Sequence, residues 1–100
     1  MRIIGGQFRG RPLRQPKFKP TRPTTDIAKE GLFNILSNRF NFDKVSFLDL
    51  FSGTGAISYE FASRGCQDIT SVERHRPCIN FIKQTSQTLS IPNHKIFVMD

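Results

Sequence analysis

The sequence predicts an α/β fold with three parallel strands, and two patterns support that prediction. From Val45 to Met99, strand-like apolar segments alternate with helix-like segments in the order strand, helix, strand, helix, strand. That order is typical of a parallel sheet with right-handed helical crossovers. The second pattern is the run DLFSGTG at residues 49–55, where a strand passes through two glycines into a helix. The run predicts a strand, a tight turn and a helix.

Size and composition narrow the class of protein. One hundred residues allow at most one domain with a modest core, and ten Phe against one Tyr and no Trp place phenyl rings in that core. No apolar run approaches the roughly 20 residues of a membrane span, and the amino terminus lacks a signal-peptide core. Cys66 and Cys78 are too few for a disulfide framework, so we expect buried free thiols in a reducing cytoplasm.

The positive charge is concentrated in the first 25 residues, which hold seven Arg and Lys and no acid. From Val45 onward, five basic residues balance five acidic ones. A basic arm of this kind is typical of proteins that contact a phosphate backbone, and salt should weaken such binding steeply. The alternative is a solvated basic tail. We therefore divide the chain into a basic arm, residues 1–25, expected to contact a phosphate backbone, and a body, residues 26–100.

Within the arm, residues 1–13 hold two short apolar pieces around a glycine-rich bend, which predicts a small β-hairpin. Three prolines in residues 14–23 predict an extended connector. A helix from residue 26 to about 38 follows, with an N-cap from the Thr-Thr-Asp run at 24–26. Its spacing predicts one buried stripe: Ala28, Gly31, Leu32, Ile35 and Leu36.

The body continues with a strand over 45–51 and a helix over 56–64 that Gly65 ends. A strand over 68–73, a helix from Pro77 to about 89 and a strand over 95–99 complete it. Three strands would leave the first open along one side unless the arm covers it. We therefore expect this chain to be a piece of a longer protein.

The glycine turn is the candidate ligand site. The first amides of a helix lack helical partners and carry partial positive charge, and glycines let a ligand approach the backbone. Asp49, near the strand tip, would repel a polyphosphate but attract a cationic ligand group. Glu73 ends the second strand and could accept hydrogen bonds from ribose hydroxyls, and Asp100 ends the third. The three acids predict a crevice for a nucleoside ligand with a positive charge.

Two competing sites fit less well. A dinucleotide-binding fingerprint needs a third small residue where Ser58 stands, and a phosphate loop needs a Gly-Lys-Ser/Thr run that the chain lacks. His75 and His94 are interpreted as surface residues without a metal or catalytic role, because neither has a second ligand at suitable spacing.

The residues also resemble a known family. The run at 49–55 looks like motif I of S-adenosylmethionine-dependent methyltransferases. Arg22-Pro23-Thr24-Thr25-Asp26 and the opening MRIIGG are similar to the amino-terminal segments of the bacterial RsmD family. The resemblance covers essentially the whole chain and implies a Rossmann-like methyltransferase fold, of which these are the first three parallel strands. The family methylates the exocyclic N2 of a guanine in small-subunit ribosomal RNA.

Carried over to this chain, the resemblance implies S-adenosyl-L-methionine as cofactor and small-subunit ribosomal RNA or the assembling small subunit as partner, without metal or membrane, for a monomeric enzyme. The implied cofactor-binding residues are Asp49, Phe51, Ser52, Gly53, Gly55, Glu73, Met99 and Asp100. The implied RNA-binding residues are Arg9, Arg11, Arg22, Thr24 and Thr25.

The family's catalytic motif, Asn or Asp followed by Pro-Pro and an aromatic residue, is absent from these 100 residues. That motif would orient the acceptor amine toward the methyl group. We therefore assign no catalytic residue and expect no methyl transfer by residues 1–100 alone. The alternative function is a non-catalytic nucleic-acid-binding protein that retains a decayed cofactor fold.

Overall fold

The computed structural model describes residues 2–11, 13, 16–17 and 24–99. Its elements are α1 (Asp26–Ser37), the 3-10 helix η1 (Phe42–Lys44), β1 (Ser46–Leu50), α2 (Ala56–Ser63), β2 (Asp68–Glu73), α3 (Arg76–Leu89) and β3 (His94–Val98). The helices and strands predicted for residues 26–100 are all present, with ends shifted by a residue or so. In the described part of that stretch, η1 is the one element that was not expected. No helix among the described residues is long and apolar enough to cross a bilayer.

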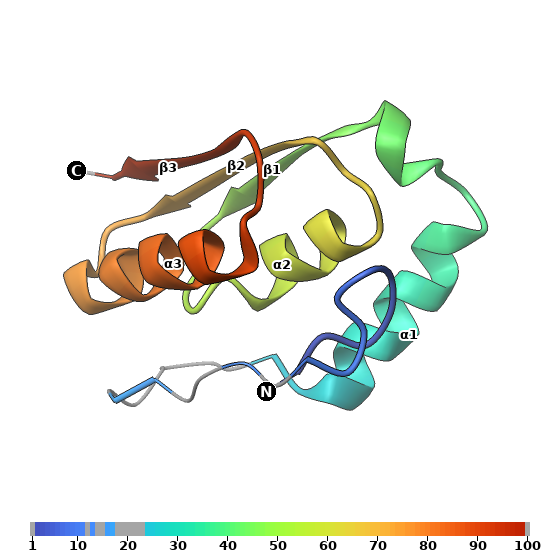
Figure 1. Cartoon of the computed structure of the whole chain (residues 1–100), viewed down its shortest axis with the longest axis horizontal. Helices are drawn as coiled ribbons and strands as arrows, with labels where there is room; N and C mark the ends of the chain where they lie inside the picture. Colours follow the sequence, from blue (N-terminus) through green and yellow to red (C-terminus); the bar gives the residue numbers. More distant parts are fainter. Residues whose placement is uncertain (1, 12, 14–15, 18–23, 100) are drawn as a thin grey trace.

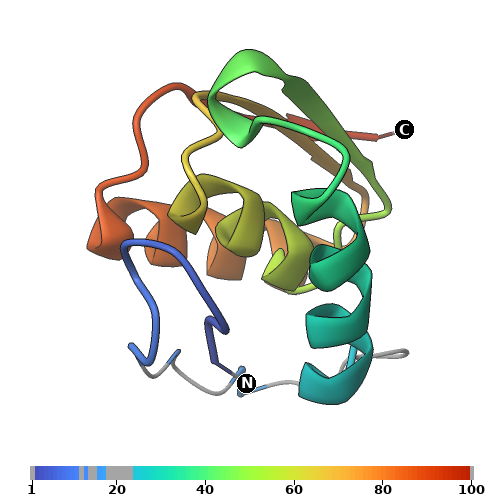
Figure 2. The same ribbon diagram turned by 90° about the vertical axis from the view of Figure 1, so that its right-hand side faces the viewer.

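The three strands form one parallel sheet in the order β1-β2-β3, which confirms the predicted α/β class. Leu50 pairs with Val72, and Val72 pairs with Phe97, so the carboxyl ends of the strands meet at one edge. Helices α2 and α3 run beneath the same face of the sheet, and α1 lies beside α2 (Figures 1 and 2). The chain between β1 and α2, residues 51–55, therefore lies at the edge where β2 and β3 also end.

The two faces of the sheet differ in burial. Phe47 and Asp49 point to the helix-covered face and are partly buried, whereas Leu48 and Leu50 are more than half exposed on the other face. Phe97 of β3 lies on the same face, separated from Leu50 by Val72 of β2, and is also exposed. Among the described residues, no segment lies over this second face in either view.

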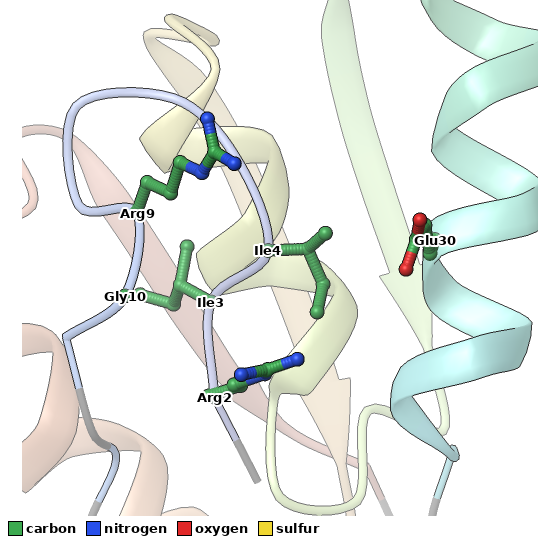
Figure 3. Close-up of a pocket in the computed structure, with 6 residues that line it drawn as sticks. All are labelled: Arg2, Ile3, Ile4, Arg9, Gly10 and Glu30. Atoms are coloured by element: carbon green, nitrogen blue, oxygen red, sulfur yellow. The ribbon is translucent and has the colours of Figure 1, made fainter.

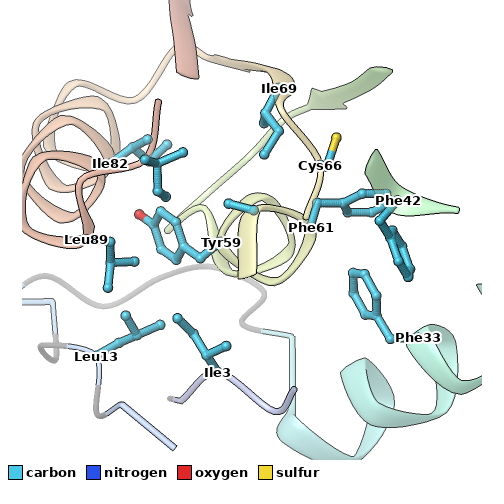
Figure 4. Packing of buried hydrophobic residues seen from close by; sticks show 12 residues of the cluster. Ile3, Leu13, Phe33, Phe42, Tyr59, Phe61, Cys66, Ile69, Ile82 and Leu89 are labelled. Atoms are coloured by element: carbon cyan, nitrogen blue, oxygen red, sulfur yellow. The ribbon is translucent and has the colours of Figure 1, made fainter. Parts of the chain in front are cut away.

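Phenyl rings form one side of the core, as the composition predicts. Phe61 of α2 stacks on Phe47 at 3.8 Å between ring centroids, and the rings of Phe33 and Phe42 meet it edge-on at 5.1 and 5.4 Å. Figure 4 shows Phe33, Phe42 and Phe61 of this cluster together with Tyr59, which is fully buried. Edge-on and stacked contacts of this kind each add to the stabilisation that burial provides. Both cysteines are buried free thiols, as expected.

The basic arm doubles back on itself, but not as a hairpin of paired strands. The amide of Gly10 donates to the carbonyl of Ile3 at 3.0 Å, while turns occupy residues 7–10, and Arg2 alone among the described arm residues is in a β-bridge. Ile3 is fully buried and Leu13 nearly so, and both belong to the core cluster. The described part of the arm is therefore not a solvated tail: Ile3 and Leu13 pack on the body while Arg2, Arg9 and Arg11 stay exposed. The boundary after residue 25 stays a prediction.

Helix α2 holds the arm in place. Glu60 is fully buried and accepts hydrogen bonds from the amides of Ile4 and Gly5, each at 2.9 Å. One turn later, Ser63 accepts from the Phe8 amide through its hydroxyl and from the Gln7 amide through its carbonyl. These contacts go to α2 and not to β1, so among the described residues the arm does not cover the open side of the first strand.

Two cations complete the surroundings of Glu60. Lys29 of α1, 1% exposed, places Nζ 3.6 Å from Oε1, and Arg64 donates from Nε to Oε2 at 2.9 Å. Burial lowers the pKa of Lys29, although the Glu60 carboxylate opposes that shift. The described part of the chain thus contains a buried ion network that joins α1, α2 and the arm.

The predicted buried stripe of α1 is largely wrong. Lys29 and Phe33 are buried, whereas Leu32 is 41% exposed and Ile35 58% exposed. Ala28 and Gly31 are exposed too, and only Leu36 of the predicted stripe packs against the core. The physical reason is that the ion pair with α2 and the phenyl cluster place the face of Lys29 and Phe33 toward the body.

Candidate functional site

The turn after β1 is held in an unusual backbone conformation. Phe51, Gly53 and Gly55 have φ of 58°, 59° and 83°, in the left-handed region that favours glycine. For a phenylalanine this conformation costs free energy, and such strain clusters at ligand-binding sites. Ser52 fixes the turn, because its hydroxyl donates to the Asp49 carbonyl at 2.7 Å and its carbonyl accepts from the Gly55 amide at 2.9 Å.

Gly53 and Gly55 have different surroundings. A Cβ on Gly55 would lie 2.6 Å from the Tyr59 hydroxyl, which itself donates to the Thr54 carbonyl at 2.5 Å. A Cβ on Gly53 would meet nothing within 4 Å. Gly55 is thus required for packing inside the protein, whereas Gly53 borders open space that a ligand could occupy.

Glu73 reaches from the end of β2 to this turn. Its Oε1 accepts from the Gly53 amide at 2.7 Å, and its Oε2 accepts from the amides of Arg74 and His75 at 2.9 Å. Burial alone would raise the pKa of Glu73, but these three amide donors outweigh it and lower the pKa. The carboxylate is therefore ionised at neutral pH and keeps lone pairs for further donors such as ribose hydroxyls.

Asp49 lies on the helix-covered face of β1 and not beyond the strand tip. Its Oδ2 accepts from the Ser58 hydroxyl at 2.6 Å. Burial raises the pKa of Asp49, and the hydrogen bonds of Ser58 and Ser52 oppose this shift. A buried carboxylate attracts a cation more strongly than an exposed one, because little water screens it. The position suits the cationic ligand that the sequence predicts.

Sequence reasoning missed three side chains behind Asp49. Ser58 and Ser71 are fully buried, and they continue a line of hydrogen bonds to His94, which is half-buried. The interpretation of His94 as a surface residue was therefore wrong. The available signal was the alternation along β2, which places Ser71 on the inward face between Ile69 and Glu73.

The remaining predicted cofactor residues are at the same edge or outside the described part. The Met99 amide donates to the Glu73 carbonyl at 2.8 Å, so Met99 extends the pairing of β3 with β2. Phe51 is 71% exposed beside the turn. Asp100 lies outside the described residues, and its expected place in the crevice stays a prediction.

The described members of the predicted RNA contacts lie on the arm and just before α1. Arg9 and Arg11 are exposed, and the Arg11 guanidinium lies 5.5 Å from the centre of the Phe8 ring. Thr24 is exposed, while Thr25 caps α1 by accepting from the Ala28 amide at 3.1 Å. Arg22 lies outside the described residues.

A cleft of about 200 Å³ separates the arm from α1. Figure 3 shows the side chains around it, with Glu30 on the α1 side; its lining is Arg2, Ile3, Ile4, Arg9, Gly10 and Glu30. Arg2 also lies 3.6 Å from Asp26. Guanidinium groups on an open cleft are well suited to phosphate and base edges.

Comparison with known proteins agrees with this geometry. The family model described as "Conserved hypothetical protein 95" matches residues 1–100. The chain is 38% identical over 94 residues to YlbH of Bacillus subtilis and 38% identical over 96 residues to ribosomal RNA small subunit methyltransferase D of Escherichia coli K12. It covers 50% and 48% of those proteins, so the chain spans about half the length of the curated relatives it matches.

Solved structures give the same picture. The Escherichia coli protein yhhF superposes with a TM-score of 0.87 at 36% identity, over 100% of this chain and 53% of that one. Coclaurine N-methyltransferase, solved with N-methylheliamine and SAH, superposes with a TM-score of 0.58 at 24% identity, over 83% of this chain and 25% of that one. At that identity the second likeness shows the Rossmann-like fold alone.

Proposed function

Because the chain belongs to the family described as Conserved hypothetical protein 95, the RsmD family of ribosomal RNA methyltransferases, we propose that the whole protein methylates small-subunit ribosomal RNA. The methyl donor in this proposal is S-adenosylmethionine, and the acceptor is the exocyclic N2 of a guanine. The setting is the cytoplasm, and the protein acts as a monomer.

One observation carries the cofactor part of this proposal. The amide of Gly53 and the carboxylate of Glu73, 20 residues apart, are 2.7 Å apart where β1 and β2 end. A glycine turn beside an acid on the next strand is the arrangement that binds a nucleoside in open α/β sheets. In the proposal, Glu73 accepts from the ribose hydroxyls, the turn borders the methionine end, and residues 99–100 meet the adenine.

Asp49 fits the charge of that cofactor. S-adenosylmethionine supplies a methyl group on a sulfonium cation and also carries an ammonium group. The Asp49 carboxylate would attract these positive charges from the covered face of β1, and Ser58 holds that carboxylate in place.

The arm supports RNA as the acceptor. Its exposed arginines lie on a fixed loop, because Glu60 and Ser63 tie that loop to α2. Arg9 and Arg11, together with Arg22 and the threonines at 24 and 25, are the proposed RNA contacts. Phosphate contacts of this kind position an RNA without reading its sequence.

In this proposal, methyl transfer needs residues outside positions 1–100. A guanine amine is a weak nucleophile that must be oriented toward the methyl group, and residues 1–100 hold no Pro-Pro motif to do so. We therefore propose that residues 1–100 alone transfer no methyl group. Cofactor-dependent methylation of ribosomal RNA by this segment would contradict that part of the proposal.

The test of the cofactor site is a thermal-shift titration of the whole protein with S-adenosylhomocysteine. A ligand at 100 times its dissociation constant should stabilise the folded state by about 2.7 kcal/mol. Gly53→Trp fills the open space at the turn and should abolish the shift. Gly10→Trp is the matched control, because Gly10 also has a positive φ and open space around it, but on the arm.

Two results would count against the proposal. A shift that survives Gly53→Trp would mean that the cofactor binds elsewhere. No shift in the unaltered protein, with RNA binding intact, would favour a non-catalytic nucleic-acid-binding protein that has lost its cofactor.

A further inference from the structure

A continuous line of hydrogen bonds runs behind the proposed cofactor site. The Ser58 hydroxyl lies 2.6 Å from Asp49 Oδ2 and 2.8 Å from the Ser71 hydroxyl. Ser71 lies 2.7 Å from His94 Nε2, and His94 Nδ1 lies 2.9 Å from the Ser86 hydroxyl. This chain of four hydrogen bonds joins β1, α2, β2, β3 and α3, and we call it the hydroxyl chain.

The hydroxyl chain is an interior feature. Ser58 and Ser71 have 0% of their surface exposed, and Ser86 has 8%. Buried polar groups of this kind need partners inside the protein, because water cannot serve them. Each member of the chain is therefore constrained by its neighbours.

With Asp49 ionised, the donor and the acceptor of every hydrogen bond in the hydroxyl chain are determined. An ionised carboxylate only accepts, so Ser58 must donate to Asp49. Ser58 has a single proton, so Ser71 must donate to Ser58, and His94 must in turn donate from Nε2 to Ser71. A neutral imidazole then accepts at Nδ1, and Ser86 donates to it.

From this order we infer that His94, Ser71 and Ser58 are positioning residues that hold the Asp49 carboxylate ionised and oriented for the positive charge of the cofactor. The inference deepens the proposed function and rests on it. A proton placed on Asp49 Oδ2 would make Ser58 an acceptor and reverse the chain, and this reversal would need the other tautomer of His94. The hydroxyl chain therefore couples the protonation state of the Asp49 carboxylate to the tautomer of His94, which lies two strands away.

The pKa shifts of Asp49 and His94 agree with this order of donors and acceptors. Burial raises the pKa of Asp49 and works against its ionised form, and Glu73 of β2 adds to that shift. The hydrogen bond from Ser58 opposes both, and Tyr59 of α2, whose pKa is raised by burial, stays neutral beside it. Burial lowers the pKa of His94, so the imidazole is neutral at pH 7, as the chain requires.

The binding test compares three variants and one control variant of the whole protein with S-adenosylmethionine as the probe, by calorimetry between pH 5.5 and 8.5. Ser58→Ala should weaken binding about tenfold at pH 7, which is about 1.4 kcal/mol, and should move the acidic limb of the profile to higher pH. Ser71→Ala should give a smaller change in the same direction, and Ser71→Thr should restore it. Ser46→Ala is the matched control, since it removes a serine–aspartate hydrogen bond at the other end of β1.

A second readout does not depend on the cofactor. Nitrogen-15 chemical shifts of the His94 ring should show the Nε2–H tautomer at pH 7 in the unaltered protein, and Ser71→Ala should weaken that preference. The Nδ1–H tautomer would overturn the proton order. Unchanged affinity and pH profile in Ser58→Ala and Ser71→Ala would overturn the positioning role alone. No binding by the unaltered protein, with the Nε2–H tautomer present, would instead refute the proposed function.

Discussion

Replacing Glu60 by Gln should detach the basic arm from the body. All four partners of this carboxylate are donors: the amides of Ile4 and Gly5, the Arg64 guanidinium and the Lys29 ammonium. The NH₂ group of a glutamine would face two of these donors, either Ile4 and Lys29 at the Oε1 position or Gly5 and Arg64 at the Oε2 position, and it could accept from neither. The variant would keep the shape of the side chain and lose its charge.

The magnitude follows from burial. Glu60 is 0% exposed and Lys29 is 1% exposed, so the variant leaves a positive charge inside the protein without its counter-ion. Breaking a buried ion pair by removing one partner costs about 3 to 5 kcal/mol. Native domains are stable by only about 5 to 15 kcal/mol, so the loss should be large.

Urea unfolding and amide hydrogen exchange on the whole protein provide the measurement. The amides of Ile4 and Gly5 should lose protection in Glu60→Gln, and Lys29→Met in the same protein should recover part of the lost free energy by removing the uncompensated charge. Glu30→Gln is the matched control, because Glu30 lies beside the arm but is exposed. A loss below about 1 kcal/mol, the value typical of an exposed pair, with both amides still protected would refute the reasoning.

Three further predictions concern the site and the arm. Asp49→Asn should weaken cofactor binding without lowering the free energy of unfolding at pH 7. Because folding raises the pKa of Asp49, this group stabilises the folded protein below its pKa in the unfolded chain. That stabilisation is lost as the pH rises through the pKa of Asp49 in the folded protein. A lower urea midpoint at pH 7 would contradict this. Gly53→Ala should cost about 1 kcal/mol of backbone strain. Gly55→Ala should cost clearly more, because its Cβ would collide with the buried Tyr59 ring. Equal losses of unfolding free energy on chemical denaturation would be evidence against the packing role of Gly55. Replacing Arg9 and Arg11 by Ala should lower the salt slope of RNA binding by about one per lost phosphate contact, and an unchanged slope would remove the arm from the RNA interface.

The elements of the fold could be predicted because their signals are local. The glycine turn, the proline at the start of α3 and the apolar strands each act over a few residues, and the strand over 68–73 was predicted with its observed bounds. The meeting of the glycine turn and Glu73 at one edge also followed, since parallel strands bring their carboxyl ends together.

What could not be predicted depends on partners distant in the sequence. The buried face of α1 is set by Glu60, 31 positions after Lys29, so helical spacing alone favoured the wrong stripe. From the sequence, Ser58 was interpreted only as a departure from a dinucleotide fingerprint, and His94 as a surface residue. Their roles depend on Ser71, which contacts both once β2 and β3 pair. Such contacts leave no mark in any short window of sequence.

The hydrogen bonds by which Glu60 and Ser63 of α2 hold the arm also have a consequence for the order of folding. These hydrogen bonds join residues 55 to 58 positions apart, so the arm leaves the ribosome well before α2 and has no partner there until α2 follows. At synthesis rates of about 5 to 20 residues per second, that interval is roughly 3 to 11 seconds. During this time the basic arm is undocked inside a cell rich in RNA. Docking of the arm thus reports that α2 has formed, and an arm still open marks a nascent chain that has not yet built its glycine turn and helix.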